Sequence, residues 1–247
     1  MKFKKIVGFG DSWMYGDELL DPDLLKTSPD AHSCWYQNDD YRTSHCFLGL
    51  LGKHYDVPVQ NFGIPGGSLQ SEIWTLLWWL DNEPHPEDCL VLVGHTDADR
   101  MSWYDHDHRS YTNDPPWNRF VHTAWTEATD DVVSPDWKSL NKQFITMVAG
   151  DEFNYLNWLQ AMTMFDSVST SYQIPMLQFQ IAPMESKKEF PTQIWPDQDL
   201  ISYFFKHPAN ANGLRGLWCK NGHPNELGHE LIRDRLISEI DHVILSE

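Results

Sequence analysis

The stretch Lys5-Ile6-Val7-Gly8-Phe9-Gly10-Asp11-Ser12 is the most informative part of the chain, because a short apolar run ends there in a polar turn. Residues 5–9 have the composition of a parallel strand that is buried on both faces. The carboxyl ends of such strands form the edge of the sheet where α/β proteins bind ligands. Ser12 is therefore a candidate nucleophile at that edge. Asp-Ser after a glycine is also ordinary turn chemistry, so this stretch alone leaves a purely structural role open.

Three further apolar runs have the same character, and helix-like segments separate them. They cover residues 58–62, 89–93 and 176–181. Strands that alternate with helices predict right-handed βαβ crossovers. We therefore expect a three-layer α/β/α sandwich with a central parallel sheet.

Apolar residues at helical spacing predict the helices that cover this sheet. They span 68–82, with Ser68 as the N-cap, 152–172, and a last helix that runs from Asn225 into the 240s. We expect the following side chains to face the core: Ile73, Leu76, Leu77, Leu80, Phe153, Leu156, Leu159, Met162, Phe165, Val168, Leu227, Leu231, Leu236, Ile240 and Val243.

The size and composition of the chain favour one domain over residues 1–247. A chain of 247 residues that is 41% hydrophobic is long enough to bury a full core. Two irregular stretches interrupt the repeating pattern, at about 99–136 and 183–216, although a short helix is expected around residues 200–205. Long loops in compact domains are commonly binding loops or lids, so we interpret both as insertions that shape a cleft, with surface decoration as the alternative.

The charge of the chain argues against two classes of partner. Lys and Arg total 18 against 36 Asp and Glu, which gives a formal net charge of −18 at pH 7. Such a charge repels phosphate backbones and anionic lipid, so we expect no nucleic-acid and no membrane partner. The apolar run near the start is too short for a signal peptide and no later run is long enough to span a membrane, which predicts a cytoplasmic protein unless something else exports it. The oligomeric state is not indicated.

Four cysteines are scattered without a C-x-x-C pair, at positions 34, 46, 89 and 219, so reduced thiols are expected. Cys219 lies near His223, which leaves a chemical role for its thiol open. The run Asp105-His106-Asp107-His108, with His95, offers metal donors. Alternating residues of an extended chain point to opposite sides, so at most two of these four can face one ion without a special turn. We predict neither a metal nor a cofactor.

Three other blocks place polar groups where strands or turns end. The second strand runs into Asn61-Phe62-Gly63-Ile64-Pro65-Gly66-Gly67-Ser68, a glycine-rich turn whose amides are suited to hold an oxyanion, although it is equally good as a tight structural turn. The third strand ends in Gly94-His95-Thr96-Asp97. Near the C-terminus, Gly222-His223-Pro224-Asn225 places a histidine before a helix that we expect to begin on the proline. His229, farther along, is expected at the surface or in helix packing.

These four blocks, in this order, resemble those of the SGNH hydrolases, the GDSL esterase and lipase family. In that family the serine of Gly-Asp-Ser is the nucleophile, and a late histidine before Pro-Asn is the base. A glycine of Asn-x-Gly-x-x-Gly and an asparagine of Gly-x-Asn-Asp complete the oxyanion hole with the amide of the serine. The resemblance extends over nearly the whole chain and implies the flavodoxin-like SGNH fold. Matched position by position, it assigns these roles to Ser12, His223, Gly66 and Thr96.

Two departures from the family pattern affect the expected mechanism. Thr96 replaces the asparagine, and its hydroxyl is a shorter and more freely rotating donor, so we expect weaker oxyanion stabilisation. The family aspartate three residues before the histidine is Lys220 here, with Asn221 next to it. We expect Asn221 or a backbone carbonyl to accept from the Nδ1–H of His223, which reduces the predicted machinery to a Ser12–His223 dyad or an atypical triad.

The resemblance implies a serine hydrolase that cleaves an ester of a small acyl group. The irregular loops offer Trp, Tyr, Asn and Asp rather than a broad aliphatic surface, which favours a small-molecule or carbohydrate ester, such as an O-acetylated sugar. The alternative is an SGNH-fold module that has lost catalysis and binds carbohydrate or a protein. The C-terminal block and Thr96 also resemble divergent SGNH-like proteins encoded by bacteriophages, which would imply a virion-associated protein.

Overall fold

The computed structural model of the chain describes residues 3–33, 35–104, 120–122, 139–140, 142–144, 148, 150–184, 188–210 and 216–244. Within them, four parallel strands form the central sheet in the order β2-β1-β3-β6. Their bounds are β1 Lys5–Gly10, β2 Val59–Gly63, β3 Cys89–His95 and β6 Met176–Gln180. The four predicted strands are therefore present, each within a residue or two of its expected limits. All three pairings are parallel, as the alternation of strands and helices predicted.

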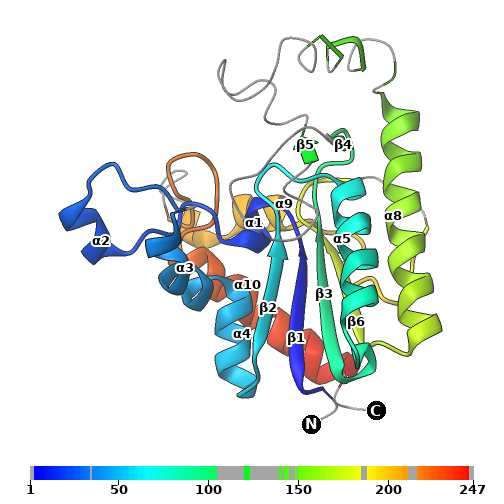
Figure 1. Cartoon of the computed structure of the whole chain (residues 1–247), viewed down its shortest axis with the longest axis horizontal. Helices are drawn as coiled ribbons and strands as arrows, with labels where there is room; N and C mark the ends of the chain where they lie inside the picture. Colours follow the sequence, from blue (N-terminus) through cyan, green and yellow to red (C-terminus); the bar gives the residue numbers. More distant parts are fainter. Residues whose placement is uncertain are drawn as a thin grey trace.

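Helices cover both faces of the sheet, so the predicted three-layer α/β/α arrangement is confirmed (Figure 1). On one face lie α5 (Leu69–Asn82) and α8 (Asp151–Tyr172). On the other lie α4 (Phe47–Tyr55), α9 (Leu200–Lys206) and α10 (Glu226–Glu239). The remaining elements are short: α1 Ser12–Tyr15, α2 Pro22–Thr27, α3 Asp39–His45, a separate antiparallel pair of β4 Ser102–Tyr104 with β5 Phe120–His122, the 3₁₀ turns Tyr36–Asn38, Pro86–Asp88 and Pro208–Asn210, and a final π-helical turn Ile240–Ile244.

The alternating side chains of the strands divide the core into two parts. In β3, Leu90 and Leu92 pack on the side of α4 and α10, whereas Val91 and Val93 pack on the side of α5 and α8. All seven residues of β3 are buried. A strand in the middle of a parallel sheet has no solvent face, which is why these sequences read as unbroken apolar runs.

Three of the predicted core positions on the helices are exposed instead. Leu77, Leu156 and Leu227 are 46%, 54% and 47% exposed. A spacing of three residues drifts around a helix that has 3.6 residues per turn, so the buried stripe of α8 runs through Trp158, Ala161, Met162 and Phe165. The last helix begins at Glu226 rather than on Pro224, and Asn225 is its N-cap.

Of the two predicted insertions, much of 99–136 lies outside the described residues. The second, 183–216, includes α9, as expected, and residues 185–187 and 211–215 of it are outside the described part. In the part of the chain that the structure describes, no helix has both the length and the apolar character that a membrane span requires.

Candidate active site

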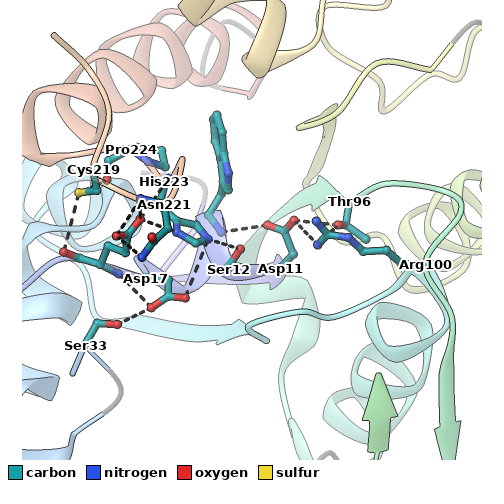
Figure 2. Close-up of polar contacts among 12 residues, drawn as sticks. Asp11, Ser12, Asp17, Ser33, Thr96, Arg100, Cys219, Asn221, His223 and Pro224 are labelled. Carbon is teal, nitrogen blue, oxygen red and sulfur yellow. Dashed lines mark hydrogen bonds and ion pairs between the residues drawn. The ribbon is translucent and has the colours of Figure 1, made fainter. Parts of the chain in front are cut away.

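Ser12 lies at the carboxyl edge of the sheet, directly after β1. Asp11 is the N-cap of α1, and its carboxylate accepts a hydrogen bond of 2.9 Å from the Trp13 amide, as expected of a turn residue. The chain then turns over the sheet edge and buries most of Ser12, which is 7% exposed. Ser12 Oγ lies 2.9 Å from Nε2 of His223, which is 211 residues away in sequence (Figure 2). The structure therefore brings together the two side chains that the sequence singles out.

A tight turn holds His223 in this position. Its backbone oxygen accepts from the Cys219 amide at 2.7 Å, and the Asn225 amide donates to the Leu217 oxygen at 2.9 Å. Trp218 and Pro224 form an antiparallel bridge across the same turn. These bonds fix the backbone on both sides of the histidine.

The other ring nitrogen of His223 contacts a carboxylate that the sequence analysis did not select. Nδ1 lies 2.9 Å from Oε2 of Glu18, and neither Asn221 nor a backbone carbonyl takes this place. The expectation for Asn221 is wrong, because its side chain and its amide both donate to Glu18. Asn221 therefore holds the Glu18 carboxylate in place and does not contact the ring of His223 as an acceptor.

Asp17, the neighbour of Glu18, lies on the opposite side of the imidazole. Its Oδ2 is 3.9 Å from His223 Nε2, beyond hydrogen-bond distance. Its Oδ1 accepts from the Ser33 hydroxyl and from the Glu18 amide. Two carboxylates therefore flank the ring, and one of them makes a hydrogen bond to it.

The glycine-rich turn after β2 packs against α1. A Cβ on Gly63 would lie 2.3 Å from the Tyr15 nitrogen, so only glycine permits this approach. Gly66 has φ 71°, in the left-handed region that favours glycine. Within the described part of the chain, the amides of Ser12 and Gly66 have no hydrogen-bond partner. An unpaired amide on the nucleophile itself, as in Ser12, is suited to bind an anionic oxygen.

Thr96 does not occupy the role that its position in the sequence suggested. Its hydroxyl donates to Asp11 Oδ2 at 2.7 Å, and Arg100 Nη1 donates to the Thr96 oxygen at 3.0 Å. The same Arg100 nitrogen lies 3.3 Å from Asp11 Oδ2. A hydroxyl has one proton to donate, and here that proton is directed to a carboxylate. Figure 2 shows this cluster on the side of Ser12 opposite to His223.

A buried polar chain supports the loop that carries Thr96. Glu72 of α5 accepts from the Thr96 amide at 3.2 Å and contacts His95 Nδ1 at 2.9 Å. His95 Nε2 lies 2.8 Å from Gln178 of β6. Burial raises the pKa of the Glu72 carboxyl, and the hydrogen bond from His95 opposes that rise. Since both ring nitrogens of His95 contact protein groups, this histidine has no free nitrogen for the metal site considered above.

The other metal candidates, residues 105–108, lie outside the described residues. Among the described residues, no group of three or more metal-ligating side chains converges. Cys46, Cys89 and Cys219 are free thiols, and Cys34 is outside the described part. Burial raises the pKa of the Cys219 thiol to about 11, which leaves it protonated and poorly nucleophilic near neutral pH.

Comparison with known proteins gives distant structural similarities. The sequence matches no family model and no curated protein. In fold, the chain is similar to a psychrotrophic esterase from Pseudoalteromonas sp., with a TM-score of 0.45, 12% identity and 97% of each chain covered. A member of the lipolytic protein G-D-S-L family from Veillonella parvula gives a TM-score of 0.43 at 12% identity, covering 95% of this chain and 96% of that one.

A family two carbohydrate esterase from Clostridium thermocellum is also similar, with a TM-score of 0.36 and 14% identity. It covers 97% of this chain, which in turn spans 64% of that chain. Of these three neighbours, one is a lipolytic protein of the G-D-S-L family and two are esterases.

Glu18 is the residue of the site that sequence reasoning missed. It follows the nucleophile by six positions, in a loop with no motif around it, and it has a left-handed φ of 64°. The available indication was indirect: the carboxylate expected before His223 is absent, and Gly16-Asp17-Glu18 places two acids just after Ser12.

Proposed function

We propose that this protein is a serine hydrolase that cleaves an ester of a small acyl group. The observation that carries the proposal is the 2.9 Å contact between Ser12 Oγ and His223 Nε2 at the carboxyl edge of a parallel sheet. A serine hydroxyl is a weak nucleophile until a base removes its proton, and an imidazole nitrogen at hydrogen-bond distance is such a base. The unpaired amide of Ser12 supports the same chemistry.

Acylation begins when Ser12 Oγ attacks the carbonyl carbon of the ester. His223 Nε2 takes the hydroxyl proton as the new C–O bond forms, and the carbonyl oxygen becomes an oxyanion that the amides of Ser12 and Gly66 hold. The tetrahedral intermediate then collapses. The bond to the alcohol breaks, His223 returns the proton to the departing oxygen, and an acyl-serine remains.

Deacylation repeats these steps with water in place of Ser12 Oγ. His223 removes one proton from the water as its oxygen attacks the acyl carbon, and then gives that proton back to Ser12 Oγ as the acid leaves. The nucleophile and the base are thus restored. Because the Thr96 hydroxyl donates to Asp11, it does not serve as a third donor, and the oxyanion is held by the amides of Ser12 and Gly66 alone. Removing one donor from an oxyanion hole typically slows turnover about 10²- to 10³-fold, so we expect modest rates.

An acetylated carbohydrate is the proposed substrate, and this part rests on sequence alone. The aromatic and polar residues that suggest it, such as Trp117 and Trp125, belong to the predicted insertion at about 99–136 and lie outside the described residues. The repulsion between anionic polymers and a chain of charge −18 disfavours strongly acidic substrates.

Labelling with a fluorophosphonate probe tests the proposed nucleophile. The probe forms a covalent bond with an activated serine, so the native chain should label, and Ser12→Ala and His223→Ala should not. Ser167→Ala is the matched control, because Ser167 is an exposed serine on α8. Acetate release from nitrophenyl acetate and from acetylated xylan, measured on the same four proteins, then reports turnover. Equal rates for the native chain and Ser12→Ala would refute the assignment.

A binding module that uses the SGNH fold without catalysis is the second candidate. The hydrogen bond from Thr96 to Asp11 favours it, because this bond removes a third oxyanion donor. The contact between Ser12 and His223 argues against it. An unlabelled native chain that binds an acetylated sugar in calorimetry would establish this second function.

A further inference from the structure

We infer that Glu18 is the acid of this site, a positioning residue that orients His223 and stabilises its charged form. The inference rests on the proposed function and adds the one group that the sequence blocks lack. Lys220 stands where a carboxylate is expected, and no sequence spacing points to a replacement. In the folded chain, Glu18 Oε2 lies 2.9 Å from His223 Nδ1.

The hydrogen bonds around Glu18 show which form of the carboxyl group fits. Asn221 donates its amide to both oxygens, at 3.1 and 3.0 Å, and its Nδ2 to Oε1 at 2.8 Å. The His223 amide lies 3.4 Å from Oε2. Every one of these protein partners is an N–H donor, and only an ionised carboxylate accepts from all of them. An ionised Glu18 requires a proton on Nδ1 of the imidazole, which leaves Nε2 free to accept from Ser12.

The local backbone brings Glu18 back toward the nucleophile. The short helix α1 has Gly16 as its C-cap, which is left-handed with φ 81°, and the Asp17 amide donates to the Ser12 oxygen at 2.9 Å. Nη1 of Arg42 donates a hydrogen bond of 2.6 Å to the backbone oxygen of Tyr15. Glu18 itself has φ 64°. This left-handed conformation is unfavourable in free energy for any residue other than glycine. Its contacts to the 217–225 turn retain this strained conformation.

The two other polar side chains near the ring do not fit this role. The Asp17 carboxylate lies 3.9 Å from Nε2, on the Ser12 side of the ring and not beside Nδ1, and it already accepts a hydrogen bond from the Ser33 hydroxyl. Asn221 directs its donors to Glu18. The acid therefore comes from the same N-terminal segment as the nucleophile, six residues after it, and the base comes from the far end of the chain.

Glu18→Gln tests the inference, with Glu230→Gln as the matched control on the exposed surface of α10. The amide keeps the shape of the side chain but removes its charge and can present an N–H to Nδ1. The corresponding change in a serine protease lowers kcat about 10⁴-fold, and we expect a loss of about 10³-fold or more in kcat with little change in KM. The control should keep its full rate. A Glu18→Gln rate within tenfold of the native rate would overturn the inference.

Nitrogen NMR of ¹⁵N-labelled histidine provides a readout that needs no variant. In the native chain, neutral His223 should carry its proton on Nδ1, and Glu18→Gln should raise the share of the Nε2–H form. A native Nε2–H form would contradict the inference even if Glu18→Gln fails to fold. If Ser12→Ala removes activity and Glu18→Gln does not, the proposed function stands and the inference fails. If Ser12→Ala keeps activity, the function itself fails.

Discussion

The hydroxyl of Thr96 illustrates how one hydrogen bond changes the role of a residue. At its position in the third block, a side-chain donor to the oxyanion is expected, but Asp11 receives the proton at 2.7 Å. The carboxylate is the stronger acceptor and is present before any substrate binds. Thr96 therefore joins Asp11 and Arg100 in a structural cluster beside the nucleophile.

Thr96→Val removes this hydroxyl and keeps the branched shape. Since Arg100 still contacts Asp11, we expect kcat to fall less than about tenfold, well below the loss of about 10²- to 10³-fold for a missing oxyanion donor. Steady-state kinetics on nitrophenyl acetate measures this change. A loss of 100-fold or more would mean that the hydroxyl does face the oxyanion.

Gly66 is the residue whose amide we expect to contribute most to the oxyanion hole after Ser12. Its φ of 71° is strained for alanine, so Gly66→Ala should lower the free energy of unfolding by about 1–2 kcal/mol. The displaced amide should also lower kcat by about 10²-fold. Urea denaturation and initial rates measure both effects. Gly150→Ala, at an extended position with open space around it, is the control, and an unchanged kcat in Gly66→Ala would argue against the role.

At the scale of elements, α10 is joined to α4 by a buried histidine. His229 Nδ1 accepts from the Phe47 amide at 3.2 Å, and the two rings are stacked with centroids 5.8 Å apart. His229 is fully buried. Burial, with a smaller contribution from the charge of His223, lowers the pKa of His229 from 6.5 to about 3. Of the two positions expected from the sequence, helix packing is confirmed and the surface position is wrong.

This histidine should make the fold sensitive to acid. Below its unfolded-state pKa of 6.5 the unfolded chain binds a proton that the native chain excludes until about pH 3. Stability should therefore fall by up to roughly 1.4 kcal/mol per pH unit as pH decreases through this window. Urea denaturation of His229→Gln should show a smaller pH slope than the native chain. The exposed His54→Gln should keep the native slope, and an equal slope in all three would contradict the prediction.

The contact of α5 with β3 and β6 depends on the buried pair of Glu72 and His95. Glu72 is 2% exposed and His95 is 0% exposed. His95→Ala leaves the carboxyl group without its partner, and breaking a buried pair in this way typically costs about 3–5 kcal/mol. We expect a loss of that size in urea denaturation. A loss below about 1 kcal/mol would show that the carboxyl group is satisfied without His95.

At the scale of the whole molecule, the order of the strands explains where the site forms. The chain leaves β1 toward β2 and returns to β3 on the other side of β1, so the crevice opens outside the carboxyl ends of β1 and β3. Ser12 follows β1, and Thr96 follows β3. His223 lies in the turn before α10 and reaches the same edge, where its Nε2 is 2.9 Å from Ser12 Oγ (Figure 2).

The net charge of −18 should affect which esters reach this edge. At low ionic strength the field of the chain repels anionic substrates, and salt screens that field. We expect kcat/KM for a carboxylate-bearing aryl ester to rise with salt, while the value for a neutral aryl ester stays nearly constant. Equal salt responses for the two esters would show that the charge near the site is balanced locally.

The amino-acid sequence was enough to predict the layers and the parallel sheet, and its resemblance to the SGNH hydrolases implied the pairing of Ser12 with His223. Apolar runs and polar strand ends are local patterns, and a side chain at the end of a buried parallel strand has one edge of the sheet to occupy. The prediction of which helix residues are buried was less exact. A spacing of three residues shifts around a helix of 3.6 residues per turn, so Leu156 was assigned to the buried face although it is exposed.

Only the tertiary structure decided the acid and the role of Thr96. Glu18 and His223 are 205 residues apart in the sequence. The turn that carries Glu18 toward His223 has left-handed backbone at Gly16 and Glu18, which no periodic pattern in the sequence reveals. The Thr96 hydroxyl donates to Asp11 because the ends of β3 and β1 bring the two side chains within 2.7 Å of each other. Hydrogen bonds form over such distances, and only the folded chain sets them.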